Sequence, residues 1–302
     1  MIKKLHQVED LLAGRPPGKI AVVAAHDINV LSSLKEAYDR GFAQPILIGN
    51  KGKIIDIANE IGFDLSGVNI IQQDNNHKSA RVAIELAQRG EAQALMKGIL
   101  PTADFMKAVL NREIGLKTDR LISHTMVIEN KNYPKLLYVT DAAINIEPDL
   151  MQKVELINNS VDIAKALGVK KPKVAVLAAI EAVNPSMKST LDAALLTQMN
   201  KRGQIEGCIV DGPLALDLAI SPESVKQKKV KSDVAGDADV LLLPNIDAAN
   251  ILVKSLAFLQ KSKMCHIITG SKAPLVVTSR SDGSMIKYYS IITALALCRN
   301  CK

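Results

Sequence analysis

The sequence has few aromatic residues and no tryptophan. Aromatic side chains make up 3% of its 302 residues, so the apolar 48% consists mainly of Val, Ile, Leu and Ala. An aliphatic core of this kind is typical of buried parallel sheets that are covered by helices. The length fits one large domain or two ordinary domains, and the apolar content is sufficient for a sizeable core.

Long apolar runs and cysteine pairs are also scarce. No run reaches the roughly 18 residues of a membrane span, and the N-terminal MIKKLHQVED turns polar before a signal-like segment forms. We therefore expect a cytoplasmic protein with no membrane partner. Cys208 and Cys265 lie in apolar runs and are interpreted as core residues. Cys298 and Cys301 form a single C-x-x-C, which without a second Cys or His pair is weak evidence for a zinc or redox site.

Several ligand-binding motifs are missing. No G-x-G-x-x-G follows a strand-like run and no H-E-x-x-H is present, so we expect neither a bound dinucleotide nor a built-in metal. The net charge of +7 is spread along the chain, with its densest group at KQKKVK (226–231). Aromatic stacking platforms for nucleic acid are scarce. A solvated basic face, or attraction to polyphosphate ligands, explains the charge as well, and no nucleic-acid partner is predicted.

Short apolar runs alternate with longer amphipathic segments. Ten of these runs are too short for helices and rich in branched residues, which predicts strands. The runs are IAVVAA (20–25), PILIG (45–49), ALMKG (94–98), TMVIE (125–129), LLYVT (136–140), VAVLAA (174–179), CIVDG (208–212), VLLLP (240–244), HIITG (266–270) and PLVVTS (274–279). Helical patterns include 77–90 and a long segment within 147–173. The alternation predicts an α/β fold with a mainly parallel sheet.

Polar side chains follow five of the predicted strands. Loops after strand C-termini are where open α/β folds usually build sites. Taken one at a time, the first four clusters are explained by helix caps and turns. Together with Thr278, Ser279 and Arg280 they supply hydroxyls, amides and cations suited to binding and transferring anionic groups. The first four clusters contain Lys97, Gly98, Thr102 and Lys107; Asn184, Ser189, Thr190 and Asp192; Asp211 and Asp217; and Asn245, Asp247, Asn250 and Lys254.

The first cluster is MKGILPTADFMKAVL (96–110). Thr102 is a natural N-cap for the helix that follows, and a helix N-terminus presents free N–H groups and a positive end that suit a phosphate. Lys97 and Lys107 add positive charge. A capped surface helix with solvated lysines is the alternative interpretation.

Five long motifs occur in the order seen in phosphate acyltransferases. They are MKGILPTADFMKAVLNREIGLKTDRLISH, VNPSMKSTLDAALL, RGQIEGCIVDGPLALDLAI, DVAGDADVLLLPNIDAANILVKSLAF and GSKAPLVVTSRSD. The chain most resembles the phosphate butyryltransferase branch of the phosphotransacetylase family, from about Lys19 to about Leu297.

This resemblance implies a reversible reaction in which an acyl-CoA and phosphate give an acyl phosphate and free coenzyme A. Phosphate attacks the thioester directly, coenzyme A is a substrate or product, and no cofactor stays bound. The implied fold is similar to that of isocitrate and isopropylmalate dehydrogenases, with two α/β domains and the site in the cleft between them. Residues 1–144 with 280–302 would form one domain and residues 145–279 the other. The family usually forms homodimers or larger assemblies.

The resemblance also implies roles for individual residues. Ser279 and Arg280 match the catalytic Ser-Arg pair, with the hydroxyl aimed at the sulfur and the guanidinium near the oxyanion and the phosphate. Candidates for the phosphate and acyl phosphate are Thr102, Lys107, Lys97 and Gly98, and polar candidates for the coenzyme A side of the cleft are Asp211, Asn245, Asn250, Lys254 and Asp282.

Three positions depart from the family pattern, one of which is Ala249, where a glycine is common before Asn250. Lys107 stands where the family often has an arginine, so phosphate would be held less directionally. Ile286 stands where phosphotransacetylases carry a carboxylate assigned as the base for the thiol, and Asp282 is the nearest carboxylate.

Three alternatives remain beside a butyryl or branched-chain transferase. They are a phosphate acetyltransferase, a coenzyme A- or acyl phosphate-binding protein without turnover, and an NAD-dependent dehydrogenase of the same fold. The dehydrogenase is disfavoured because neither a dinucleotide fingerprint nor an acidic metal cluster is found.

Overall fold

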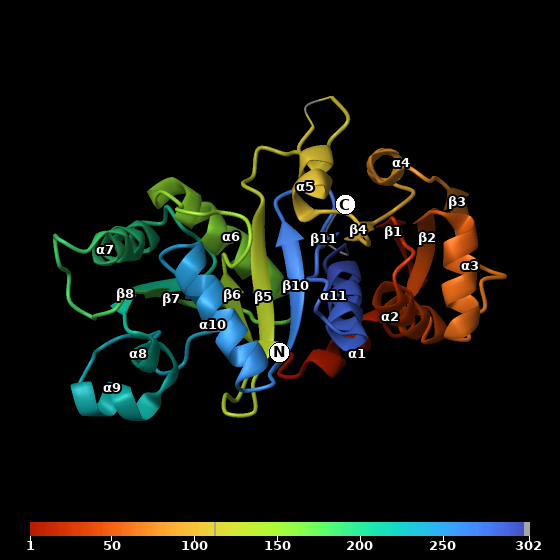
Figure 1. Ribbon diagram of the computed structural model, residues 1–302. Helices are drawn as coiled ribbons and strands as arrows, with labels where there is room; N and C mark the ends of the chain where they lie inside the picture. The colour runs from red at the N-terminus through yellow and green to blue at the C-terminus, as the bar shows by residue number, and fades with distance from the viewer. Residues whose placement is uncertain (112, 299–302) are drawn as a thin grey trace. The chain divides into compact units, whose positions relative to one another are not determined.

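The computed structural model describes residues 1–111 and 113–298, and it divides into two compact units (Figure 1). The central unit contains Met1–Leu5 and Leu121–Met264, and the terminal unit contains His6–Arg120 and the chain from Cys265 onward. Both units are α/β, as the sequence predicts.

In the terminal unit the strand order is β3-β2-β1-β4-β11-β10, and every neighbouring pair is parallel except β10 with β11. These strands are β1 (Gly18–Val23), β2 (Ala43–Gly49), β3 (Asn69–Gln72), β4 (Ala94–Lys97), β10 (Lys263–Thr269) and β11 (Leu275–Val276). The helical segments are η1 (Leu5–Gln7), α1 (Val8–Leu12), α2 (Ile28–Asp39), α3 (Lys51–Glu60), α4 (Asn76–Gln88), α5 (Thr102–Val109) and α11 (Ser284–Leu297). Helices α2 and α11 pack together on one side of β1 and β4, and α4 and α5 pack together on the other (Figure 1).

In the central unit the strand order is β5-β6-β9-β7-β8, and only β5 is antiparallel to its neighbour. The strands are β5 (Ser123–Glu129), β6 (Leu137–Thr140), β7 (Lys173–Leu177), β8 (Ile209–Leu214) and β9 (Val240–Leu242). The helices are α6 (Leu150–Ala166), α7 (Lys188–Lys201), α8 (Leu216–Ile220), α9 (Pro222–Lys228) and α10 (Ile246–Phe258).

The ten strands predicted from short apolar runs are all present, and so are the helical patterns at 77–90 and within 147–173. Strand β3 was not predicted. Its four residues have half-buried or exposed side chains, so no apolar run marks it. The central strands β1 and β4, by contrast, are almost fully buried, as continuous apolar runs in parallel sheets should be.

The boundaries of the units differ from the expected domains at 144/145 and 279/280. They fall after Arg120 and after Met264 because of strand pairing. Strand β5 pairs with β6, and β6 pairs with β9, which keeps 121–144 in the central unit. Strand β11 pairs with β4 and β10, which keeps 265–279 in the terminal unit.

None of the helices in the described part of the chain combines the length and the apolar character that a membrane crossing requires.

Candidate functional site

A cavity of about 280 Å³ lies in the terminal unit, among loops that follow strands β1, β4 and β11. Because these three strands are parallel neighbours, their carboxyl ends meet at one edge of the sheet. Two groups of residues predicted from separate stretches of sequence come together there. The cavity is lined by Asp27, Val30, Lys97, Gly98, Ile99, Thr278, Ser279, Arg280 and Lys287.

Gly98 lets the loop after β4 pass close to the end of β1. Its N–H donates to the carbonyl of Val23 at 2.7 Å, and the next N–H, of Ile99, donates to the carbonyl of Ala24 at 3.0 Å. A Cβ on residue 98 would lie 2.2 Å from the Ala24 carbonyl oxygen, which no side chain tolerates. Ala24 itself has a φ of 50°, in the left-handed region. Both loops are therefore built for a close backbone approach at the cavity.

Lys97 is a buried cation without a carboxylate partner. Its side chain ends the buried strand β4 and is 5% exposed. Nζ donates to the carbonyl oxygens of Gly98 at 3.2 Å and Leu100 at 3.0 Å, and no ion pair joins it within the described residues. Burial lowers the pKa of Lys97, and the charges of Arg280 and Lys287 lower it further, while Asp27 acts in the opposite direction.

The turn that carries Ser279 and Arg280 is fixed through Asp282. The Asp282 Oδ2 accepts the Ser279 N–H at 2.6 Å and lies 3.1 Å from the Nε2 of His266. The Ser279 and Ser281 hydroxyl oxygens lie 2.9 Å apart. Burial tends to raise the pKa of Asp282, but the hydrogen bond and charge of His266 outweigh it, so this pKa is lowered. Asp282, a predicted cleft residue, is thus a structural support of the turn, and it does not line the cavity.

Lys287 holds the same turn from α11. Its Nζ donates to the carbonyls of Ser279 at 3.0 Å and Asp282 at 2.6 Å, and its side chain is 3% exposed. Burial lowers its pKa, against the charges of Asp282 and Asp27. The Arg280 side chain is exposed and makes no hydrogen bond or ion pair within the described residues, so its guanidinium is available to a ligand.

Sequence reasoning missed Asp27 and Lys287. Lys287 is the single charged residue in the helix MIKYYSIITALAL, and this isolated charge could have marked it as a candidate site residue. Asp27 follows the strand-like run IAVVAA, but it also caps α2 by accepting the Val30 N–H at 2.9 Å, and a cap alone gives no sign of a site.

Two of the predicted phosphate ligands do not line the cavity. Thr102 is the first residue of α5 and not its cap, because Pro101 occupies the cap position and no side chain bonds the first turn. The side chains of Thr102 and Lys107 are exposed. Their contact with phosphate stays a prediction.

The remaining predicted residues lie in the central unit and have local partners. Asn245 caps α10 by accepting the Ala248 N–H at 3.1 Å, as the sequence allowed, and Asn250 donates to the Ala142 carbonyl at 3.0 Å. Lys254 lies over the ring of Phe258 on the same helix. Asp211 accepts the N–H of the next residue at 2.9 Å, within β8 and not in a turn after it, because that strand continues to Leu214.

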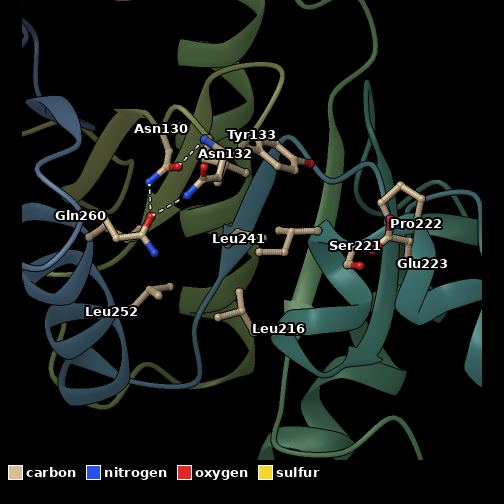
Figure 2. Close-up of a pocket in the computed structure, with 13 residues that line it drawn as sticks. Asn130, Asn132, Tyr133, Leu216, Ser221, Pro222, Glu223, Leu241, Leu252 and Gln260 are labelled. Carbon is tan, nitrogen blue, oxygen red and sulfur yellow. Dashed lines mark hydrogen bonds between the residues drawn. The ribbon is translucent and has the colours of Figure 1, made fainter.

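A larger cavity, of about 370 Å³, lies in the central unit (Figure 2). Five leucines are among its lining residues, and its polar lining includes a cluster of amides in which Asn130 donates to the side-chain oxygen of Gln260 at 2.8 Å. It contains none of the predicted site residues and no lysine or arginine among its lining residues. A cavity without a cation does not suit an anionic substrate, so the smaller one is the better candidate despite its size.

Cysteine chemistry has little support in the described residues. Cys298 donates its thiol to the carbonyls of Gln93 and Ala294, each at 3.2 Å, and Cys301 lies outside the described residues. No cluster of three metal-ligating side chains is found in the part of the chain that the structure describes.

Comparison with known proteins identifies the family. The family model described as "Phosphate acetyl/butaryl transferase" matches residues 73–295. The chain belongs to this family. It is 43% identical to the phosphate butyryltransferase of Clostridium acetobutylicum over 99% of its own length and 100% of that protein. It is also 43% identical to the phosphate acetyltransferase of Thermotoga maritima, over 90% of this chain and 92% of the relative.

A solved structure of a branched-chain phosphotransacylase from Enterococcus faecalis V583 has the same fold. It matches with a TM-score of 0.82 and 31% identity, over 93% of this chain and 99% of the other. The family resemblance read from the five motifs, the transferase class and the α/β fold are thereby confirmed.

Proposed function

We propose that the chain transfers a short acyl group, butyryl or branched, reversibly between coenzyme A and inorganic phosphate. The observation that carries this proposal is the charge of the cavity in the terminal unit. Three cationic side chains, Lys97, Arg280 and Lys287, and a single carboxylate, Asp27, line it. The cations exceed the carboxylate by two charges, which suits a doubly charged phosphate.

Catalysis in this cavity rests on charge and position. A phosphate oxygen attacks the thioester carbonyl carbon, the carbonyl oxygen becomes an oxyanion, and the carbon–sulfur bond then breaks with the electron pair on sulfur. The exposed guanidinium of Arg280 offers paired donors to the phosphate and the oxyanion. Ser279 offers a hydroxyl to the sulfur from a turn that Asp282 and Lys287 hold in place.

The acyl chain is assigned from the relatives. Butyryl transfer is the activity in the name of the Clostridium acetobutylicum protein, and branched chains appear in the name of the Enterococcus faecalis structure. Acetyl transfer is the second candidate, because the Thermotoga maritima relative is equally identical to this chain.

We further propose that the chain acts in the cytoplasm, as a homodimer or larger assembly, without a resident cofactor. The dehydrogenase alternative loses weight because the chain belongs to a transferase family. The alternative of a coenzyme A- or acyl phosphate-binding protein without turnover can be distinguished from the enzyme only by measuring activity.

The test is phosphate-dependent release of coenzyme A. Purified protein is incubated with phosphate and butyryl-, acetyl-, isobutyryl- or isovaleryl-CoA, and free thiol is followed with a chromogenic reagent. We expect release that requires phosphate or arsenate and is fastest with butyryl or a branched chain. Arg280→Ala should lower kcat about 10²–10³-fold, while Arg202→Ala, a change at an exposed arginine outside the cavity, should not.

Two results would contradict the proposal. Folded protein that binds coenzyme A but releases no thiol from any of the four thioesters would be a binding protein. Release that is fastest with acetyl-CoA would make the chain a phosphate acetyltransferase.

A further inference from the structure

The transfer reaction needs a proton on sulfur. When the phosphate dianion attacks, its hydroxyl proton must leave, and coenzyme A must gain a proton to depart as a thiol. The family resemblance implies a carboxylate for this at the position of Ile286, which is half-buried and has no ionisable group. The side chain that moves the proton in this chain has to be found elsewhere in the cavity.

The carboxylates near the cavity are poorly placed for that step. Asp282 does not line it, and one of its oxygens already accepts the Ser279 N–H and faces His266. Asp27 lines the cavity, but its Oδ1 caps α2. Carboxyl groups ordinarily titrate near pH ~4, far below thiols at about 8.5, and proton transfer is most efficient between groups that titrate near the working pH.

Lys97 has the geometry of a proton carrier. Two N–H bonds of Nζ point to the carbonyls of Gly98 and Leu100, at 3.2 and 3.0 Å. A tetrahedral nitrogen fixed in this way has one position left. It holds a third N–H in the ammonium form and a lone pair in the neutral amine, so the same contacts serve both states. Lys97 also lines the cavity, so its side chain is in contact with the space that a bound molecule would occupy.

The surroundings of Lys97 also favour proton release. Three charged groups face it, Arg280 from the loop after β11, Lys287 from α11 and Asp27 from the loop after β1. Burial and the two cations lower the pKa of Lys97, and Asp27 opposes them. Lys287 is less suited, because its two carbonyl bonds hold the Ser279 turn.

We propose that Lys97 is the proton donor to the departing coenzyme A sulfur, and the proton acceptor from the thiol in the reverse reaction. This inference rests on the proposed function of the site. As the carbon–sulfur bond breaks, its electron pair goes to sulfur, an Nζ–H bond of Lys97 breaks and a sulfur–hydrogen bond forms. The neutral amine then takes the hydroxyl proton of the transferred phosphate. The acyl phosphate leaves as its dianion, and Lys97 ends the cycle as an ammonium with no net exchange of protons.

Substitutions at Lys97 distinguish two roles of its side chain, the binding of phosphate by positive charge and the transfer of a proton. Lys97→Arg keeps a cation for phosphate but does not release a proton near neutral pH. Lys97→Gln loses both. We expect kcat for butyryl-CoA and phosphate to fall about 10²–10⁴-fold in both variants, with a raised phosphate KM only in Lys97→Gln. Lys78→Gln, at an exposed lysine of α4, is the matched control. Circular dichroism melts confirm that each variant is folded.

The pH profile of kcat and an amine rescue complete the test. In both experiments the reaction is quenched, and the butyryl phosphate formed is then trapped with hydroxylamine and measured. Wild-type kcat should fall on the alkaline side as Lys97 loses its proton, and this limb should vanish in Lys97→Gln. Ethylamine should restore activity to Lys97→Ala at least about tenfold, following the fraction of protonated amine.

A wild type without phosphate-dependent turnover would refute the proposed function itself. With an active wild type, near-normal kcat in Lys97→Arg would overturn the inference, because charge alone would then suffice. So would an alkaline limb that disappears in Asp27→Asn but persists in Lys97→Gln, which would move the proton step to the carboxylate.

Discussion

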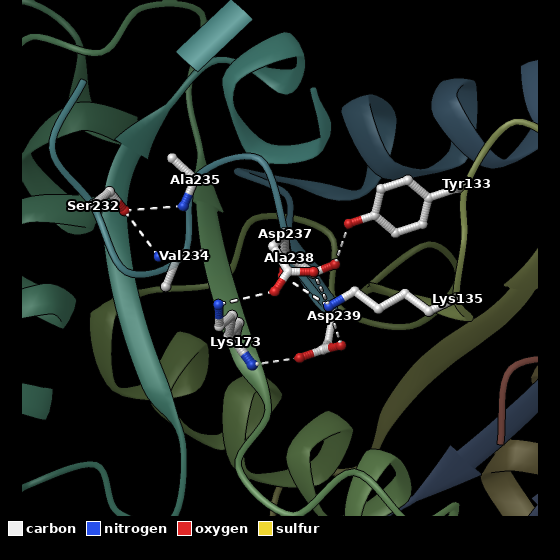
Figure 3. Close-up of polar contacts among 9 residues, drawn as sticks. All are labelled: Tyr133, Lys135, Lys173, Ser232, Val234, Ala235, Asp237, Ala238 and Asp239. Atoms are coloured by element: carbon white, nitrogen blue, oxygen red, sulfur yellow. Dashed lines mark hydrogen bonds and ion pairs between the residues drawn. The ribbon is translucent and has the colours of Figure 1, made fainter. Parts of the chain in front are cut away.

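Two buried lysines, one in each unit, have opposite surroundings. Lys135 of the central unit has a side chain that is 9% exposed and forms ion pairs with Asp239 at 2.6 Å and Asp237 at 2.8 Å (Figure 3). Its Nζ also donates to the backbone carbonyl of Asp237 at 2.8 Å, and Lys173 forms an ion pair with the Asp237 carboxylate. Lys97 of the terminal unit is just as buried but has only carbonyl partners.

The difference shows which buried charge is structural and which is poised for a ligand. Around Lys135 the protein supplies the negative charge itself, and the charges of Lys173 and Asp237 join the same network. Around Lys97 the charged groups are two further cations and one carboxylate, so this region has an excess of positive charge that suits the proposed anionic substrate. A group of three cations, two of them buried, with a single carboxylate beside them therefore marks the candidate site more clearly than cavity size does.

The largest expected effect is on stability, and it separates the two lysines. Lys135→Met leaves Asp239, whose side chain is 5% exposed, without its cationic partner. The free energy of unfolding should fall by about 3–5 kcal/mol. Lys97→Met removes a buried charge that has no carboxylate partner, so its stability should equal or exceed that of the wild type. Urea unfolding followed by circular dichroism measures both. Equal losses in the two variants would contradict the comparison.

Phosphate should stabilise the protein through one lysine and not the other. A ligand at about 100 times its Kd raises the free energy of unfolding by about 2.7 kcal/mol. Thermal melts of the wild type and of Lys135→Met should both show a shift with inorganic phosphate, whereas Lys97→Met should show little. Sulfate at equal ionic strength controls for general salt effects. A full phosphate shift in Lys97→Met would exclude this lysine from the anion site.

A substitution of Gly98 tests whether the close approach of the loop after β4 to the end of β1 is needed for phosphate binding. Gly98→Ala places a Cβ 2.2 Å from the Ala24 carbonyl oxygen, so the two loops must move apart. We expect a loss of about 1–3 kcal/mol of stability together with weaker phosphate binding. Gly283→Ala, just before α11, is the control, because its Cβ meets no atom within 4 Å. Similar behaviour of the two variants would show that the approach of the loops is unimportant.

The smallest expected effect is a pH dependence of the Ser279 turn. The pKa of Asp282 is lowered from 3.8 in the folded protein, so the protein binds this proton less readily when folded. The stabilisation is therefore present above pH ~4 and disappears as the pH falls through the lowered pKa. The difference in Tm between wild type and Asp282→Asn should shrink from pH 7 to pH ~3. A difference that grows on acidification would mean that the carboxylate does not support the turn.

Part of the fold and of the site was predictable from local patterns. Short apolar runs predicted ten strands because buried parallel strands need continuous apolar sequence. The motifs predicted the family, and they pointed to Lys97, Gly98, Ser279 and Arg280, which line one cavity. Thr102 was misplaced as a cap because Pro101 provides a suitable extended conformation without a side-chain bond.

Other features depended on pairing between distant segments. The order of the strands set the boundaries of the units. Apolar runs predict where strands lie in the sequence, but they do not predict which strands pair. Asn245 and Asn250 have the same polar character as site residues, and only the folded structure shows their bonds to Ala248 and Ala142.

The sequence by itself determined an aliphatic α/β protein with an anion-binding inventory, because composition, periodicity and ordered motifs are properties of neighbouring residues. The tertiary structure decided which charges meet. Lys97, Arg280 and Lys287 come from a strand end, a loop and a helix, and only the parallel pairing of β1, β4 and β11 brings them to one edge beside Asp27. Electrostatic energy depends on distance and burial, and neither is fixed until the chain folds.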